Sequence, residues 1–135
     1  MRAIDSDETV ATMRCVATVL VVDDHRDAND VLCRLLRLDG HRTVSAFTGE
    51  DALATLASQQ PDVIILDFMM PGMDGIETLR QIRSNPATAA LRVIMYTAVS
   101  DPAFRAHALE KGANAYFAKG QMQFSQLRDL IAPCA

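Results

Sequence analysis

Four short apolar runs, each ending at a polar residue, constrain the fold of this chain more than any other feature. They occupy residues 19–22, 63–66, 93–96 and 115–118. Runs of this length that are apolar at every position are typical of strands buried on both faces of a parallel sheet. Helical segments lie between the runs, so the sequence predicts strands and helices that alternate along the chain.

The segments between the runs carry helical periodicity and helix-capping residues. The first predicted amphipathic helix has an apolar stripe and ends near Gly40; the stripe consists of Ala28, Val31, Leu32, Leu35, Leu36 and Leu38. Thr48, Asp74 and Asp101 are each expected to cap the start of a later helix. With a short strand at residues 43–47, the order βαβαβαβαβα predicts an α/β fold with five helices and a five-stranded doubly wound parallel sheet.

Polar residues follow the predicted strands at the points where the strands end. Asp23 and Asp24 follow the first run, Asp67 follows the second, Thr97 follows the third, and Lys119 follows the fourth. The carboxyl ends of parallel strands lie at one edge of an open sheet, and ligands bind at that edge. Three carboxylates gathered there suit a divalent cation such as Mg²⁺, which prefers oxygen ligands.

Composition limits the class of protein. The chain has 135 residues, enough for one domain, which we expect at residues 18–135 after a flexible tail at residues 1–17. The net charge of −4 argues against direct binding to nucleic acid. Three widely spaced cysteines, no long apolar stretch and an acidic N-terminus predict a cytoplasmic protein without a membrane span.

The polar residues at the strand ends, together with the segment after Asp67, resemble the receiver domain of two-component response regulators. The matching motifs are Val21-Val22-Asp23-Asp24, Leu66-Asp67, Phe68-Met69-Met70-Pro71-Gly72-Met73-Asp74-Gly75, Thr97-Ala98 and Lys119. Their order and spacing match the family over about residues 18–131. The resemblance implies a flavodoxin-like sheet with strand order 2-1-3-4-5.

The resemblance also implies roles for the residues at this edge. Asp67 would be the phosphoacceptor that takes a phosphoryl group from phosphohistidine. Mg²⁺, or Mn²⁺, would be held by Asp24, Asp67 and the backbone carbonyl of Met69, with Asp23 acting on the waters of the metal.

Further residues would contact the phosphoryl group or respond to it. The Lys119 ammonium, the Thr97 hydroxyl and the Ala98 backbone amide would bind phosphoryl oxygens. Thr97 and Tyr116 would form a conformational switch, with a tyrosine merely packed at the strand end as the alternative. The response would appear on the face formed by the fourth helix, the fifth strand and the fifth helix.

The resemblance predicts a signalling switch rather than an enzyme that turns over free substrates. Its partners would be a histidine kinase or histidine phosphotransfer protein and a downstream protein target, with a homodimer as another use of the responding face. A stand-alone, single-domain regulator is the expectation, although an excised domain stays open.

Three other functions are considered. An adaptor with the same fold that is never phosphorylated stays open. An aspartate-nucleophile phosphatase needs a second acid two residues after the nucleophile, where this chain has Met69. A flavin mononucleotide carrier is disfavoured because two acids follow Val22, where a phosphate needs hydrogen-bond donors.

One position departs from the family pattern. Gly120 stands where receiver domains usually have a proline preceded by a cis peptide bond. A cis bond before a residue other than proline costs roughly 2.5–4 kcal/mol, so the Lys119–Gly120 bond is predicted to be trans.

Overall fold

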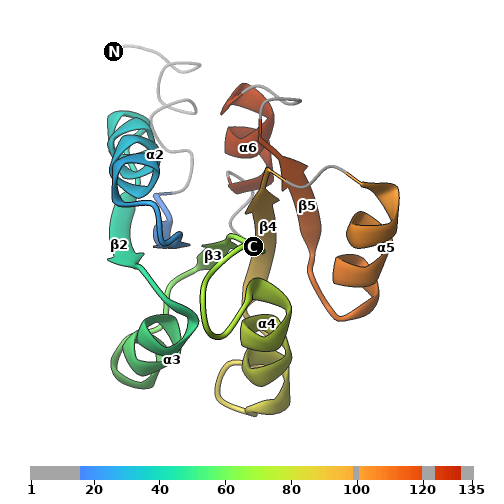
Figure 1. The fold of residues 1–135 in the computed structure, drawn as a ribbon. Coiled ribbons are helices and arrows are strands. Elements are labelled where there is room, and N and C mark those ends of the chain that lie inside the picture. Colours follow the sequence, from blue (N-terminus) through green and yellow to red (C-terminus); the bar gives the residue numbers. More distant parts are fainter. Residues whose placement is uncertain (1–15, 99–100, 120–123, 132–135) are drawn as a thin grey trace, which may run out of the picture.

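The computed structural model describes residues 16–98, 101–119 and 124–131. Within these ranges ten elements alternate along the chain (Figure 1). The strands are β1 (Thr18–Val22), β2 (Arg42–Ala46), β3 (Val63–Leu66), β4 (Arg92–Thr97) and β5 (Ala115–Ala118). The helices are α2 (Arg26–Leu38), α3 (Gly49–Ser58), α4 (Gly75–Ser84), α5 (Pro102–Glu110) and α6 (Phe124–Ile131).

The five strands form one parallel sheet in the order β2-β1-β3-β4-β5. In the register of the two central strands, Val22 lies beside Leu66. The strand ends that precede Asp23 and Asp67 therefore lie side by side. The predicted fold class, the five helices and the strand order 2-1-3-4-5 are all confirmed.

Helices cover both faces of the sheet, and alternate strand residues divide the core into two layers. On one side α2 and α6 pack against a layer that includes Val21, Ile65 and Phe117. On the other side α3, α4 and α5 pack against a layer that includes Leu20 and Ile64. Because both faces are covered, β1 and β3 need apolar residues at nearly every position, which explains their unbroken runs.

Only two of the six residues in the predicted apolar stripe of the first helix are buried. Helix α2 buries Asn29, Leu32, Cys33 and Leu36. The other four stripe residues are exposed: Ala28, Val31, Leu35 and Leu38. A helix with apolar residues on more than one side has no single apolar face in its sequence, so contact with the sheet selects which residues are buried.

The predicted caps are confirmed. Thr48 accepts a hydrogen bond from the Asp51 amide at 2.9 Å, and Asp74 accepts one from the Glu77 amide at 2.9 Å. Asp101 accepts one from the Ala103 amide at 2.8 Å. Each cap satisfies a backbone donor that the first turn of a helix leaves without a partner.

Two expectations concern residues that the structure does not describe. The tail predicted for residues 1–17 falls mainly on residues 1–15, and Gly120 lies in the gap before α6, so neither prediction is tested. Among the described helices, none combines the length and the apolar character that crossing a membrane requires.

Candidate functional site

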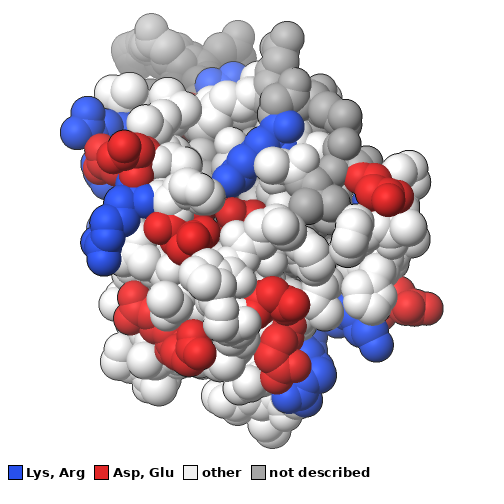
Figure 2. All heavy atoms as spheres, viewed as in Figure 1, with Lys and Arg blue, Asp and Glu red and all other residues white. Residues whose placement is uncertain are grey.

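Three carboxylates meet where β1 and β3 end. Ligand atoms of Asp23, Asp24, His25 and Asp67 all lie within 4.8 Å of one another. Asp23 and Asp67 are buried, with 3% and 5% of their surfaces exposed. Figure 2 shows acidic side chains near the middle of this face, beside a basic side chain that extends toward them. The predicted gathering of Asp23, Asp24 and Asp67 at one edge is therefore found.

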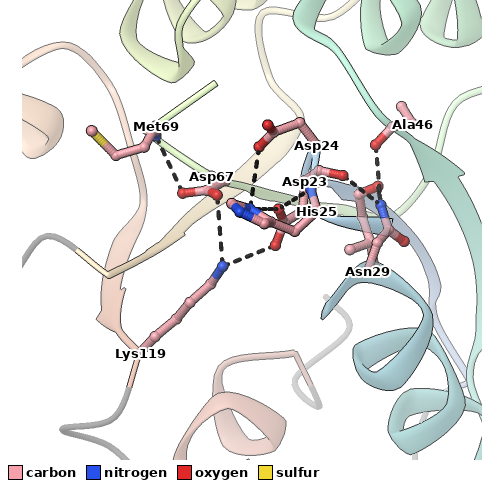
Figure 3. A network of polar contacts seen from close by, with 9 residues as sticks. Asp23, Asp24, His25, Asn29, Ala46, Asp67, Met69 and Lys119 are labelled. Atoms are coloured by element: carbon pink, nitrogen blue, oxygen red, sulfur yellow. Dashed lines mark hydrogen bonds and ion pairs between the residues drawn. The ribbon is translucent and has the colours of Figure 1, made fainter. Parts of the chain in front are cut away.

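Lys119, which follows β5, reaches into the carboxylate cluster (Figure 3). Its Nζ donates a hydrogen bond to Asp23 Oδ2 at 2.9 Å and lies 3.6 Å from Asp67 Oδ2. The ammonium thus bridges the acids at the ends of β1 and β3. One positive charge beside two buried negative charges offsets part of their repulsion.

The surroundings shift the pKa of both Asp67 and Lys119. Burial raises the pKa of the Asp67 carboxyl, and the positive charge of Lys119 opposes this rise only in part. Burial alone would lower the pKa of Lys119, but its hydrogen bond to Asp23 and the charge of Asp67 raise it instead. Lys119 therefore remains protonated, whereas the Asp67 carboxylate is held in an environment that disfavours its charge.

The cluster has the ligand chemistry of a divalent-cation site. Asp24 Oδ1 is buried and has no hydrogen-bond partner among the described residues. A buried carboxylate oxygen without a partner is costly, and a bound cation would remove that cost. The hard oxygen atoms of Asp23, Asp24 and Asp67 fit Mg²⁺ or Mn²⁺.

His25 lies at the outer side of the cluster. Its side chain is 74% exposed, and Nδ1 is 3.6 Å from a carboxylate oxygen of both Asp23 and Asp24. Its backbone amide donates to Asp23 Oδ1 at 3.0 Å. That hydrogen bond fixes the orientation of the Asp23 carboxylate at the point where α2 begins.

Sequence reasoning missed Asn29, which is buried in the first turn of α2. Its Nδ2 lies 3.1 Å from the backbone oxygens of Asp23 and Ala46, and 3.2 Å from that of Val21. The side chain therefore ties α2 to β1, β2 and the start of the acidic loop (Figure 3). A signal existed in the sequence, since Asn29 is three and four residues before Leu32 and Cys33 and so shares their buried face.

The loop after Asp67 packs closely against the start of α4. The Met69 amide donates to Asp67 Oδ1 at 3.2 Å, and the Gly75 amide donates to the Phe68 carbonyl at 3.0 Å. A Cβ atom at Gly75 would lie 2.3 Å from the Asp67 carbonyl oxygen. Glycine is required at this position because the helix meets the backbone of the loop.

The remaining predicted residues line the same edge or lie just behind it. Thr97, the last residue of β4, is fully buried, and its carbonyl accepts a hydrogen bond from the Lys119 amide at 2.8 Å. The Thr97 side chain also hydrogen-bonds Asp67 and lowers the pKa of that carboxyl. Ala98 follows at the surface. Tyr116 is buried in the core layer on the side of α5, together with Ala108.

A doubly wound sheet with acids after β1 and β3, a hydroxyl at the end of β4 and a lysine after β5 defines a class of phosphate-accepting signalling domains. The sequence model of the response regulator receiver domain matches residues 19–132. The chain belongs to this family, whose members receive phosphoryl groups from histidine kinases and act on downstream targets.

Similar proteins agree with this assignment. The chain is 36% identical to the response regulator PleD of Caulobacter vibrioides over 117 residues, which cover 84% of this chain and 26% of PleD. It is 33% identical to the phosphate regulon regulator PhoB of Pseudomonas aeruginosa over 115 residues, which cover 85% of this chain and 48% of PhoB. The chain therefore spans less than half the length of either relative.

Among solved structures, the response regulator TrrA of Thermotoga maritima in complex with Mg²⁺ and BeF superimposes with a TM-score of 0.77. It is 29% identical, and the match covers 87% of this chain and 98% of TrrA. The agreement extends over nearly the whole of the solved chain, so the likeness includes all layers of the fold.

Proposed function

We propose that this chain accepts a phosphoryl group on Asp67 from a histidine kinase or histidine phosphotransfer protein and passes the signal on by a change of conformation. One observation carries the proposal: Lys119 bridges Asp23 and the buried Asp67 at the carboxyl edge of the sheet. An ammonium and a carboxylate in contact at the ligand-binding edge supply the charge and the nucleophile that phosphoryl transfer requires.

The proposed step forms one bond and breaks another. A carboxylate oxygen of Asp67 attacks the phosphorus of phosphohistidine, and the bond between phosphorus and the imidazole nitrogen breaks. The products are an aspartyl phosphate and a histidine that takes up a proton. Lys119 would bind a phosphoryl oxygen, because it lies only 3.6 Å from Asp67, and Thr97 and the Ala98 amide would donate to others.

A divalent cation is part of the proposal. Asp23, Asp24, Asp67 and the Met69 carbonyl would hold Mg²⁺ or Mn²⁺, with Asp23 acting through bound waters. When bound, the cation neutralises charge on the transferring phosphoryl group. Asp24 Oδ1 supports this assignment, since it is buried, makes no hydrogen bond among the described residues, and has the exposed His25 imidazole, 3.6 Å away, beside it.

The signal would leave the site through Thr97 and Tyr116. A phosphoryl group on Asp67 would attract the Thr97 hydroxyl, and the ring of Tyr116 would change its packing beside α5. The affected face is formed by α5, β5 and α6, and it would bind a downstream protein or a second copy of the chain. We propose that the chain acts in the cytoplasm as a switch that does not turn over free substrates.

Intact mass measurement tests the proposal directly. Incubation with acetyl phosphate and Mg²⁺ should add one phosphoryl group to the parent chain and none to Asp67→Asn. Asp62→Asn, which changes a carboxylate at the opposite edge of the sheet, serves as a control and should label like the parent. Labelling of Asp67→Asn at the rate of the parent would refute the assignment of Asp67.

Intact mass and a phosphate-release assay together separate the alternatives. An adaptor that is never phosphorylated would gain no mass from acetyl phosphate or from a phosphorylated histidine protein. A phosphatase would release phosphate repeatedly from small phosphomonoesters. Phosphatase activity is disfavoured because Met69, two residues after Asp67, has no proton to donate.

A further inference from the structure

Tyr96 contacts the side chain of Lys119 at the edge of the candidate site. Lys119 Nζ lies over the ring of Tyr96, 5.0 Å from its centroid. This distance is within the roughly 6 Å at which an ammonium is attracted to the face of an aromatic ring. The same Nζ donates a hydrogen bond to Asp23, so the Tyr96 ring and the Asp23 carboxylate both contact the Lys119 ammonium.

The ring of Tyr96 is held in place by its neighbours. It packs against Phe117, with 5.2 Å between the ring centroids and 51° between the ring planes. Tyr96 and Lys119 also line one side of an apolar groove whose other side is formed by α2, with Val31, Leu32 and Leu35. A ring fixed in this way offers Lys119 a rigid apolar surface.

The flexible side chain of Lys119 needs such a surface to keep its ammonium in one position. Its ammonium is a point charge on a four-carbon chain with free rotation, and 24% of this side chain is exposed to solvent. Its direct hydrogen bond is to Asp23, which is also one of the proposed cation ligands. A contact that does not depend on Asp23 would keep the ammonium near Asp67 when Asp23 is engaged elsewhere.

We propose that Tyr96 is a positioning residue for Lys119: the face of its ring holds the ammonium over the acceptor site and so promotes phosphoryl transfer to Asp67. The inference rests on the proposed function of Asp67 and Lys119. It requires the aromatic ring and not the hydroxyl, which makes the two contributions separable by substitution.

The first experiment compares Tyr96→Phe with Tyr96→Leu. Labelling by acetyl phosphate with Mg²⁺ should be about three- to tenfold slower in Tyr96→Leu, the size expected for one cation–π contact at a half-buried site. Tyr96→Phe should label at nearly the rate of the parent. A Tyr96→Leu protein that labels as fast as the parent, or a Tyr96→Phe protein that is equally slow, would overturn the inference.

A cycle of variants tests whether the effect passes through Lys119. In a Lys119→Ala background, where labelling is already slow, Tyr96→Leu and Tyr96→Phe should have equal rates. A purely structural role of Tyr96 would slow the double variant further. An additional loss in Tyr96→Leu/Lys119→Ala would therefore contradict a positioning role.

A measurement without cation or phosphodonor decides the contact independently of the proposed function. The ring current of Tyr96 should shift the NMR signals of the terminal methylene protons of Lys119 upfield in the parent and in Tyr96→Phe, and Tyr96→Leu should abolish the shift. If the parent gains no phosphate but shows the shift, the proposed function fails and the contact stands. If the shift is absent from the parent, this inference fails by itself.

Discussion

Asp67 and Lys119 show how single residues set the chemistry of the site. The Asp67 carboxylate, the proposed acceptor, is buried at the end of β3, where its charge is disfavoured, and the Lys119 ammonium that offsets part of this cost comes from the end of β5. The charge of each residue affects the pKa of the other. Removing the carboxylate charge should therefore change stability as well as function.

We expect Asp67→Asn to be more stable than the parent at neutral pH without divalent cations. Because the pKa of Asp67 is raised by burial, the folded protein binds the proton more tightly than the unfolded chain does. The contribution of Asp67 to the free energy of unfolding is therefore fully present below the ordinary pKa, about 3.9, and is lost as the pH rises through the raised pKa. Asp67→Asn has no carboxyl group to titrate at this position, so its free energy of unfolding does not fall in this way as the pH rises.

Thermal melting from pH 4 to pH 8 in the presence of a chelator checks this prediction. The melting temperature of Asp67→Asn should equal that of the parent near pH 4 and should exceed it by a growing margin as the pH rises. Asp129→Asn, at an exposed position of α6, provides the control and should follow the parent. A difference in melting temperature between Asp67→Asn and the parent that is constant from pH 4 to pH 8 would contradict the raised pKa of Asp67 as its cause.

At the scale of elements, junctions between strands and helices position the site. Asn29 fastens α2 to the ends of β1 and β2, and Gly75 lets α4 approach the loop after β3. Both junctions place a helix N-terminus beside the acidic edge. The site is thus held from two helices on opposite faces of the sheet.

Gly75→Ala should destabilise the protein and slow the labelling of Asp67. The added methyl group would meet the backbone of Asp67 and Phe68, which cannot rotate away, so we expect a loss of about 1–3 kcal/mol in the free energy of unfolding. Denaturant unfolding and phosphorylation rates measure the two effects.

Gly49→Ala is the control for labelling, because its added methyl group would meet the side chains of Thr78 and Met73 and not the backbone of Asp67 or Phe68. The Thr78 hydroxyl is buried and donates a hydrogen bond to the Asp74 carbonyl at 2.8 Å, so this variant should also lose stability, but it should label nearly like the parent. Equal stability of Gly75→Ala and the parent would show that the junction of β3 and α4 is looser than the contact implies.

For the whole molecule, the site joins segments that are distant in the sequence. Asp23 and Lys119 are separated by 96 positions and meet only when the sheet is complete. A ligand of this edge therefore binds the folded chain and not the unfolded one, so binding should stabilise the entire fold.

Mg²⁺ should raise the melting temperature of the parent. At a free concentration a hundred times the Kd, the expected gain is about 2.7 kcal/mol in the free energy of unfolding. Asp24→Ala removes one proposed ligand and should show a much smaller rise in the same titration. A parent without any rise at millimolar Mg²⁺ would count against the proposed cation site.

Much of the fold and the site followed from the sequence alone. The unbroken apolar runs predicted buried parallel strands, and the residues after them identified Asp23, Asp24, Asp67, Thr97 and Lys119. This succeeded because strand ends in a parallel sheet share one edge, so local patterns are enough to bring distant residues together. Caps such as Asp74 were equally local and were equally predictable.

Other features were decided only by tertiary structure. The sequence of α2 has apolar residues on several sides, and packing against the sheet buried Asn29 and left Val31 and Leu38 exposed. The contact between Lys119 and Tyr96, like the approach of Gly75 to Asp67, depends on the distance between neighbouring elements. Periodicity specifies which residues share a face, whereas only the assembled sheet and helices determine what that face contacts.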